Sequence, residues 1–133
     1  MMARQAQCSC GQLRVLCEGV PAKVSICHCN DCRRRTGSAF GIAAFFDRTR
    51  ITIEGKAKLF TRLADNGHKV DFHFCPICGS TVFWEPARKP DMIGVAVGAF
   101  ADPLFPVPHQ SVWDNKRHSW ITFPDEIQTR PSG

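Results

Sequence analysis

The stretch ICHCNDCR, residues 26–33, holds three cysteines within six residues: Cys27, Cys29 and Cys32. A structural zinc site takes four protein ligands, so this stretch leaves one position to be filled. The fourth ligand is either another residue of the chain or an exchangeable group such as water or a substrate. The remaining cysteines help to distinguish these two cases.

Four other cysteines form two pairs whose spacing is typical of zinc ligands, Cys8-x-Cys10 and Cys75-x-x-Cys78. A Cys-x-x-Cys-Gly turn directs two sulfurs at one metal ion. In an extended Cys-x-Cys the side chains at i and i+2 share a face. We therefore predict a closed structural site made of these four thiols. Three alternatives stay open: disulfide bonds, four unrelated core cysteines, and a pairing of Cys8 and Cys10 with Cys29 and Cys32.

If those four thiols form the closed site, Cys27, Cys29 and Cys32 remain for a second site with three thiolates. Three protein ligands with one exchangeable ligand is the arrangement of catalytic zinc sites. The alternative is a second structural site that a distant aspartate or histidine completes, the histidines being His68, His73, His109 and His118. The eighth cysteine, Cys17, continues an alternating apolar pattern and is expected in the core. His28 lies between two ligands and is expected to point away from them.

A zinc ion with three thiolates has a net charge near −1, which disfavours strong activation of water and suits an incoming sulfur ligand. We therefore expect a small thiol as the substrate. Arg33, Arg34 and Arg35 follow directly and could bind carboxylates of such a substrate; a solvated helix face is the alternative. Asp31 and His28 are the candidates for a general base.

Short apolar runs alternate with turn residues along the chain, which predicts an all-β, mainly antiparallel fold. One short helix is expected over Asp31–Thr36, with Asn30 or Asp31 as N-cap and Gly37 as C-cap. We expect one domain over residues 1–123 and a tail over residues 124–133. The aromatic residues are expected in the core, among them Phe45, Phe46, Phe72, Phe74, Phe83 and Trp84.

The net charge of the chain is only a weak argument that the protein binds nucleic acid. The formal net charge is +5, but seven thiolates holding two zinc ions would reduce it to +2. No stretch has the roughly 20 apolar residues of a membrane span, and the first residues lack the apolar region of a signal peptide. We expect a cytoplasmic protein with reduced thiols, no membrane association and no nucleic acid.

Several motifs together resemble the Gfa family, named for the glutathione-dependent formaldehyde-activating enzyme and related to centromere protein V. The motifs are Cys8-Ser-Cys10-Gly11, ICHCNDCRRRTGSAF from Ile26 to Phe40, Cys75-Pro-Ile-Cys78-Gly79-Ser80 with Trp84, GVAVGAFADP from Gly94 to Pro103, and His109 with Ser119-Trp120-Ile121. The resemblance covers nearly the whole chain.

The resemblance implies a β-tent fold and two Zn²⁺ sites, one structural and one with an open position. The structural site would take Cys8, Cys10, Cys75 and Cys78, and the second would take Cys27, Cys29 and Cys32. The implied activity is carbon–sulfur lyase chemistry that joins formaldehyde and glutathione as S-hydroxymethylglutathione. A non-catalytic zinc module that binds nucleic acid or a protein is the alternative.

Overall fold

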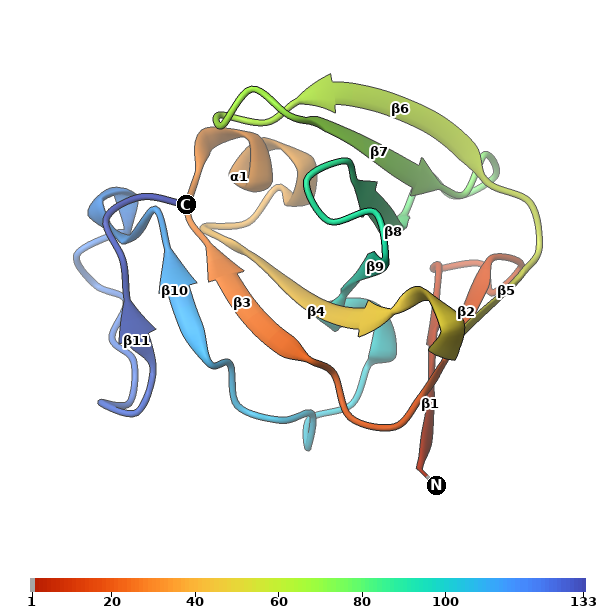
Figure 1. Cartoon of the computed structure of the whole chain (residues 1–133), viewed down its shortest axis with the longest axis horizontal. Helices are drawn as coiled ribbons and strands as arrows, with labels where there is room; N and C mark the ends of the chain where they lie inside the picture. Colours follow the sequence, from red (N-terminus) through yellow and green to blue (C-terminus); the bar gives the residue numbers. More distant parts are fainter. Residues whose placement is uncertain (1) are drawn as a thin grey trace.

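A computed structural model describes residues 2–133, which form two β-sheets and a short helix beside the larger sheet (Figure 1). The strands are β1 (Ala3–Gln7), β2 (Arg14–Glu18), β3 (Lys23–Cys27), β4 (Gly41–Asp47), β5 (Ile51–Glu54), β6 (Lys58–Leu63), β7 (Lys69–Phe74), β8 (Thr81–Pro86), β9 (Met92–Ala96), β10 (Gln110–Val112) and β11 (Gln128–Thr129). The helix is α1 (Asn30–Thr36), and three 3-10 turns are η1 (Arg48–Arg50), η2 (Val97–Phe100) and η3 (Asp114–Lys116). The all-β prediction is confirmed.

The smaller sheet has the strand order β1-β2-β5, and the larger has the order β11-β10-β3-β4-β9-β8-β7-β6. Neighbouring strands run antiparallel, except that β10 is parallel to both β3 and β11. The strands β5 and β6 are adjacent in sequence but belong to different sheets. The Gly55-Lys56 turn between them therefore carries the chain from the smaller sheet to the larger one.

Alternation along each strand gives the larger sheet two distinct faces. On β4, Ala44 and Phe46 belong to the main core, whereas Ala43 and Phe45 belong to a second apolar cluster. The side chains of a strand point alternately to opposite sides of the sheet, so the two clusters lie on opposite faces. The main core includes residues of both sheets, among them Leu13, Val15, Cys17, Val24, Phe46, Phe83 and Val95. Cys17 is fully buried there, as expected.

The second cluster contains Phe72 and Trp84, which are buried but do not belong to the main core. Phe46, Phe72, Phe83 and Trp84 are buried as expected, but in two separate clusters, whereas Phe45 and Phe74 are half-buried. Phe46 and Phe83 belong to the main core, whereas Phe45, Phe72 and Trp84 face a pocket on the other side of the sheet. The hairpin of β6 and β7 extends above that face (Figure 1).

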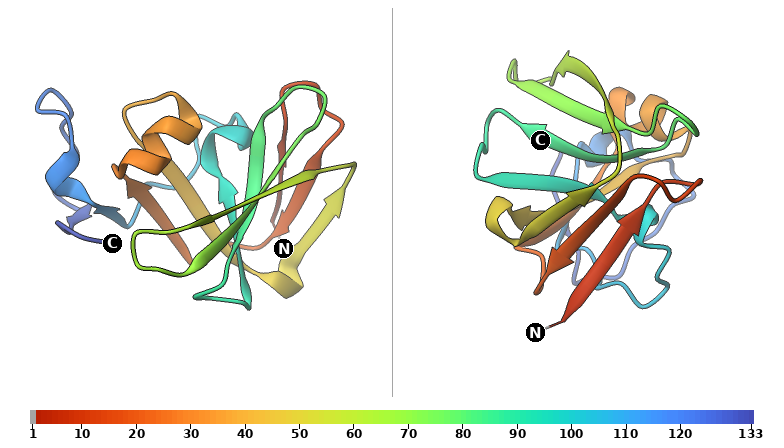
Figure 2. Two further views of the ribbon diagram at one scale, coloured as in Figure 1. Left: turned by 90° about the horizontal axis from the view of Figure 1, so that it is seen from above. Right: turned by 90° about the vertical axis from the view of Figure 1, so that its right-hand side faces the viewer.

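Residues 124–133, expected as a tail, contribute strand β11 beside β10. Ile127 is buried, and the Arg130 N–H donates to the Ser111 carbonyl at 2.8 Å. This segment and the N-terminal strands lie at opposite sides of the molecule, as the blue and red ribbons show (Figure 2). Among residues 2–133, no helix has the length and apolar character that crossing a membrane requires.

Candidate functional site

The sulfur atoms of Cys8, Cys10, Cys75 and Cys78 all lie within 4.8 Å of one another. The Sγ–Sγ distances are 3.6 Å between Cys8 and Cys10 and 3.6 Å between Cys10 and Cys75. Sulfurs in a tetrahedron around zinc, with bonds near 2.3 Å, are separated by about 3.8 Å, whereas a disulfide joins its sulfurs at about 2.05 Å. The geometry thus fits a metal ion, and it brings Cys8 and Cys10 to Cys75 and Cys78.

Two turns from different sheets carry these four thiols. Cys8 and Cys10 lie between β1 and β2, and the other two cysteines lie between β7 and β8. Gly79 has a φ of 80°, which favours glycine, and its N–H donates to the Cys75 carbonyl at 2.8 Å. The Ser9 N–H donates to Ser80 Oγ at 3.2 Å and links the two turns directly. A metal ion held here would join the smaller sheet to the larger one.

Several donors point at the sulfurs of this site. The Leu13 N–H donates to Cys8 Sγ at 3.3 Å, and Gln12 Nε2 donates to Cys75 Sγ at 3.0 Å. The Ser80 hydroxyl and neighbouring backbone N–H groups lower the pKa of Cys78 to about 5. These hydrogen bonds favour the thiolate form that a metal requires. The sequence analysis missed Gln12, because glutamine is not a metal ligand and its contact appears only in the folded chain.

The sulfurs of Cys27, Cys29 and Cys32 form a second group, again within 4.8 Å of one another. No histidine, aspartate or glutamate of residues 2–133 joins this group as a fourth ligand. Three of the four candidate histidines have other contacts. His73 Nε2 lies 2.8 Å from Glu85 Oε1, His109 Nδ1 accepts from the Val24 N–H at 2.9 Å, and His118 stacks on Trp120. The trio therefore fits a metal site with a free position.

The helix α1 positions two of these three thiols, and its N-cap is Cys29, so the prediction of Asn30 or Asp31 as the cap was wrong. Cys29 Sγ accepts from the Cys32 N–H at 3.3 Å. The Asp31 carboxylate instead pairs with Arg62 at 3.2 Å. The C-cap is Gly37 with a φ of 67°, as predicted. Hydrogen bonds from the other two thiols hold the pKa of Cys29 far below its usual range.

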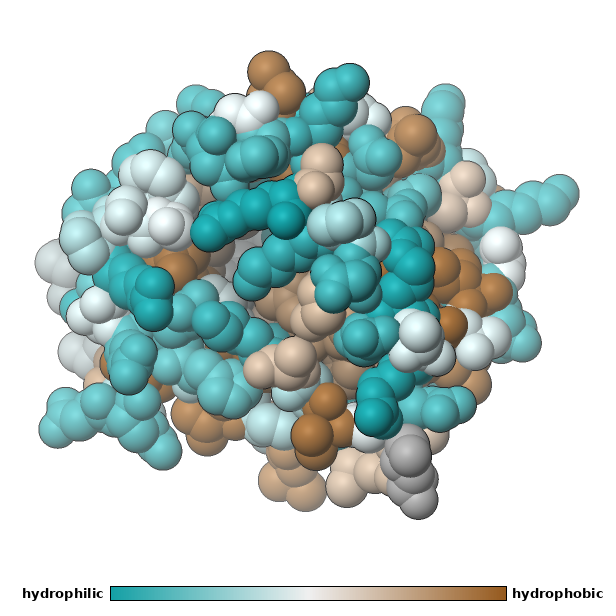
Figure 3. All heavy atoms as spheres, in the orientation of Figure 1, coloured by the Kyte–Doolittle hydropathy of each residue, from teal (hydrophilic) through white to brown (hydrophobic). Residues whose placement is uncertain are grey.

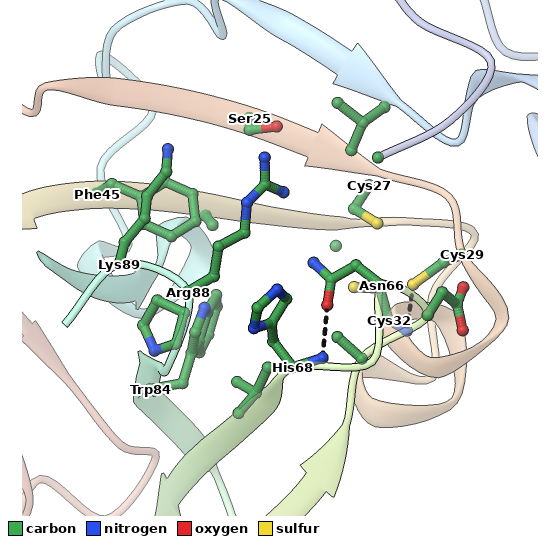
Figure 4. A pocket seen from close by; sticks show the side chains of 18 of the residues that line it. Ser25, Cys27, Cys29, Cys32, Phe45, Asn66, His68, Trp84, Arg88 and Lys89 are labelled. Atoms are coloured by element: carbon green, nitrogen blue, oxygen red, sulfur yellow. Dashed lines mark hydrogen bonds between the residues drawn. The ribbon is translucent and has the colours of Figure 1, made fainter.

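The three thiols lie at the wall of a pocket of about 310 Å³ (Figure 4). Small-molecule sites in proteins begin at about this volume. Its apolar floor includes Phe72 and Trp84 of the second cluster. Asn66 and His68, from the turn between β6 and β7, line another part of the same pocket. The pocket thus combines thiols, an apolar floor and an imidazole.

The three arginines that follow the trio take different directions. The Arg35 guanidinium lies 4.5 Å from the ring centre of Trp84 and lines the pocket with the thiols. Arg33 donates to the Asn30 side chain of its own helix at 2.6 Å. Arg34 is exposed and lines a separate hollow. Arg62 on β6, which the sequence analysis did not single out, joins Arg35 at the pocket.

His28 points away from the thiols, as expected, and is completely buried. Its Nε2 lies 2.9 Å from Ser111 Oγ, which donates to Asp114 Oδ1 at 2.8 Å. Burial is the largest influence on the pKa of His28 and lowers it. Neither His28 nor Asp31 lines the pocket, whereas His68 does. The imidazole that lines the pocket is thus on a turn that lies far from the cysteines in sequence.

Comparison with known proteins agrees with this geometry. The family model for the glutathione-dependent formaldehyde-activating enzyme matches residues 3–121. A crystal structure of a Rhodobacter sphaeroides protein superposes with a TM-score of 0.57 at 24% sequence identity, covering 74% of this chain and 91% of that chain, so the two share a fold. A search of functionally curated proteins found no match. Because the family model covers nearly the whole chain, the protein belongs to the glutathione-dependent formaldehyde-activating enzyme family.

Proposed function

We propose that this protein is a cytoplasmic, zinc-dependent enzyme of the carbon–sulfur lyase type. It would act on a glutathione-like thiol and an aldehyde, in the manner that the family name describes. The observation that carries the proposal is the position of Cys27, Cys29 and Cys32. Their sulfurs form one group in the wall of a pocket. No histidine, aspartate or glutamate of the described residues joins this group as a fourth ligand.

The two cysteine groups have separate roles in this proposal. Cys8, Cys10, Cys75 and Cys78 would hold a structural zinc ion with a complete set of ligands. The trio would hold a second zinc ion, which supplies the positive charge that keeps a substrate sulfur as a thiolate at neutral pH. The substrate sulfur would occupy the fourth position.

The remaining groups of the pocket would bind and orient the two reactants. The substrate sulfur donates an electron pair to the aldehyde carbon, and a carbon–sulfur bond forms. The carbonyl electron pair moves to oxygen, which takes up a proton; the reverse reaction breaks the same bond. His68 is the imidazole of the pocket wall and is the residue we assign to that proton transfer. Arg35 and Arg62 would bind carboxylates of the thiol.

The direct test is the rate at which formaldehyde and glutathione form their adduct, followed by NMR exchange spectroscopy with metal-loaded protein. We expect acceleration by the parent protein and by Cys17→Ala, whose cysteine is buried in the main core and belongs to neither group. Cys29→Ser should abolish the acceleration. His68→Gln should reduce it by about 10²-fold or more while leaving thiol binding intact. If the parent protein accelerates adduct formation with none of several thiols, the enzymatic proposal is wrong.

A further inference from the structure

The pocket beside the three thiols is strongly basic. Seven lysine and arginine side chains of the described residues line it, but only one acidic side chain, that of Asp65. Hydrophilic side chains surround a hollow on the face that Figure 3 shows. A cavity lined by one sign of charge concentrates ligands of the opposite sign. The charges of the pocket wall therefore influence which thiol can bind in the pocket.

Most of these cations have no carboxylate of their own. Arg62 pairs with Asp31 at 3.2 Å. None of the other six forms an ion pair within 4.0 Å across residues 2–133. Arg35 lies against Trp84, and its buried Nε has no hydrogen-bond partner there. The positive charge of the pocket is thus available to a ligand.

The cations extend from the thiols along the whole pocket. In the sheet, Cys27 is level with Gly41, whereas Lys23 is level with Phe45. Four residues along a strand correspond to about 13 Å. Lys89 Nζ lies 5.9 Å from the Phe45 ring centre, at the end of the pocket remote from the thiols. Figure 4 shows Arg88 and Lys89 on that side.

One further cation comes from a segment outside the residues that the family model matches, which end at residue 121. Arg130 directly follows β11 and lines the pocket. Its backbone N–H donates to the Ser111 carbonyl at 2.8 Å, and its carbonyl accepts from the Asp114 N–H at 2.9 Å. These two backbone hydrogen bonds hold Arg130 beside the pocket and do not depend on its side chain.

The charge of the wall is poorly matched to glutathione itself. Glutathione carries two carboxylates and one ammonium group, so it offers a single net negative charge. The ammonium group would meet seven basic side chains and one acidic side chain. We propose that the pocket selects a polyanionic thiol, one with at least two net negative charges and no ammonium group. This inference rests on the proposed thiol site and names the class of thiol that enters it.

The test compares three thiols with the same skeleton by calorimetric titration of the full-length, metal-loaded protein at low salt. N-acetylglutathione lacks the ammonium charge, and glutathione diethyl ester lacks both carboxylate charges. We expect N-acetylglutathione to bind at least about threefold more tightly than glutathione, and the diethyl ester to bind most weakly. The differences should shrink at high salt, because ions screen exposed charges.

Matched variants connect the preference to the pocket. Arg88 and Arg130 are exposed and have no side-chain hydrogen bond or ion pair among the described residues, so Arg88→Gln with Arg130→Gln should fold normally. This double variant should lose most of the preference for N-acetylglutathione. Lys58→Gln, on an exposed part of β6 outside the pocket, should keep it.

The outcomes separate this inference from the proposed function. If glutathione binds as tightly as its acetylated form, and Cys29→Ser weakens both, the thiol site stands and the charge selection is wrong. Equal binding of S-methylated N-acetylglutathione would also overturn the inference, because the pocket would then recognise anions without the thiol. Binding of no thiol at all would contradict the proposed function itself.

Discussion

Replacing Cys75 by serine and replacing Cys29 by serine should have very different effects on stability. Cys75 has no exposed surface, and its sulfur belongs to the group that joins the two sheets. Structural zinc contributes about 10–16 kcal/mol to the folding of small zinc domains. If four sulfurs share this equally, one accounts for about 2.5–4 kcal/mol. Gln12 Nε2 would also lose its bond to Cys75 Sγ, at a further cost of about 0.5–1.5 kcal/mol, because it still donates to the Lys56 carbonyl.

Cys75→Ser should therefore remove a large part of the roughly 5–15 kcal/mol that stabilises a domain of this kind. Cys29→Ser affects only the pocket group. Serine is a favourable N-cap, so its hydroxyl can replace the sulfur that caps α1. We expect Cys29→Ser to cost about 1 kcal/mol from the cap and its surroundings and to lose one metal ion.

The assay combines thermal unfolding, followed by circular dichroism, with elemental analysis of metal per chain. We expect Cys75→Ser to lower Tm by about 10 °C or more, and Cys29→Ser to lower it by a few degrees with half of the metal lost. As a control, Cys17→Ser also places a hydroxyl in the main core, but at a cysteine of neither group. This variant should keep both metal ions. If Cys29→Ser destabilised the chain as much as Cys75→Ser does, the division into a structural and an open site would be refuted.

Three further predictions concern packing, pH and a buried hydrogen bond. Gly94→Ala should lower stability by about 1–3 kcal/mol in denaturant titrations, because its Cβ would lie 2.3 Å from Trp84 Nε1. Burial raises the pKa of Glu85, but hydrogen bonds from Arg48 and His73 outweigh it and hold the pKa below its usual value. The stabilisation is therefore complete above the unfolded pKa and is lost as the pH falls; Glu85→Gln should flatten the decrease of Tm between about pH 5 and 3. Ser111→Ala should cost about 1–3 kcal/mol in the same titrations, since a buried imidazole loses its partner; a change below about 0.5 kcal/mol would contradict that role.

The cysteine groups could be predicted from the sequence because their signals are local. Cys-x-Cys and Cys-x-x-Cys spacings bring two sulfurs together within a single turn, and only the pairing of turns needs the fold. The alternation around Val15 and Cys17 likewise predicted a strand with one buried face, and both side chains are fully buried. Gly37 ends α1 in the left-handed conformation that glycine favours.

The walls of the pocket could not be predicted because they come from segments distant in sequence. Arg62, His68 and Arg130 have no motif of their own, and their common position depends on the order of strands in the larger sheet. The N-cap was missed for a different reason. Statistics of capping favour oxygen side chains, but here Asp31 pairs with an arginine and leaves the cap to a sulfur.

The strand order of the larger sheet also affects the order in which the sites are completed during synthesis. The trio is fully synthesised once residue 32 is made, but β10, the neighbour of β3, is made only at residues 110–112. The wall that includes Arg130 comes later still. At ribosomal speeds of about 5–20 residues per second, the three thiols wait about 5–20 s without this wall. From its emergence from the ribosome until the end of that interval, the nascent chain presents an uncovered thiol cluster, so access to metal, oxidants or chaperones at this stage can decide the state in which the pocket closes.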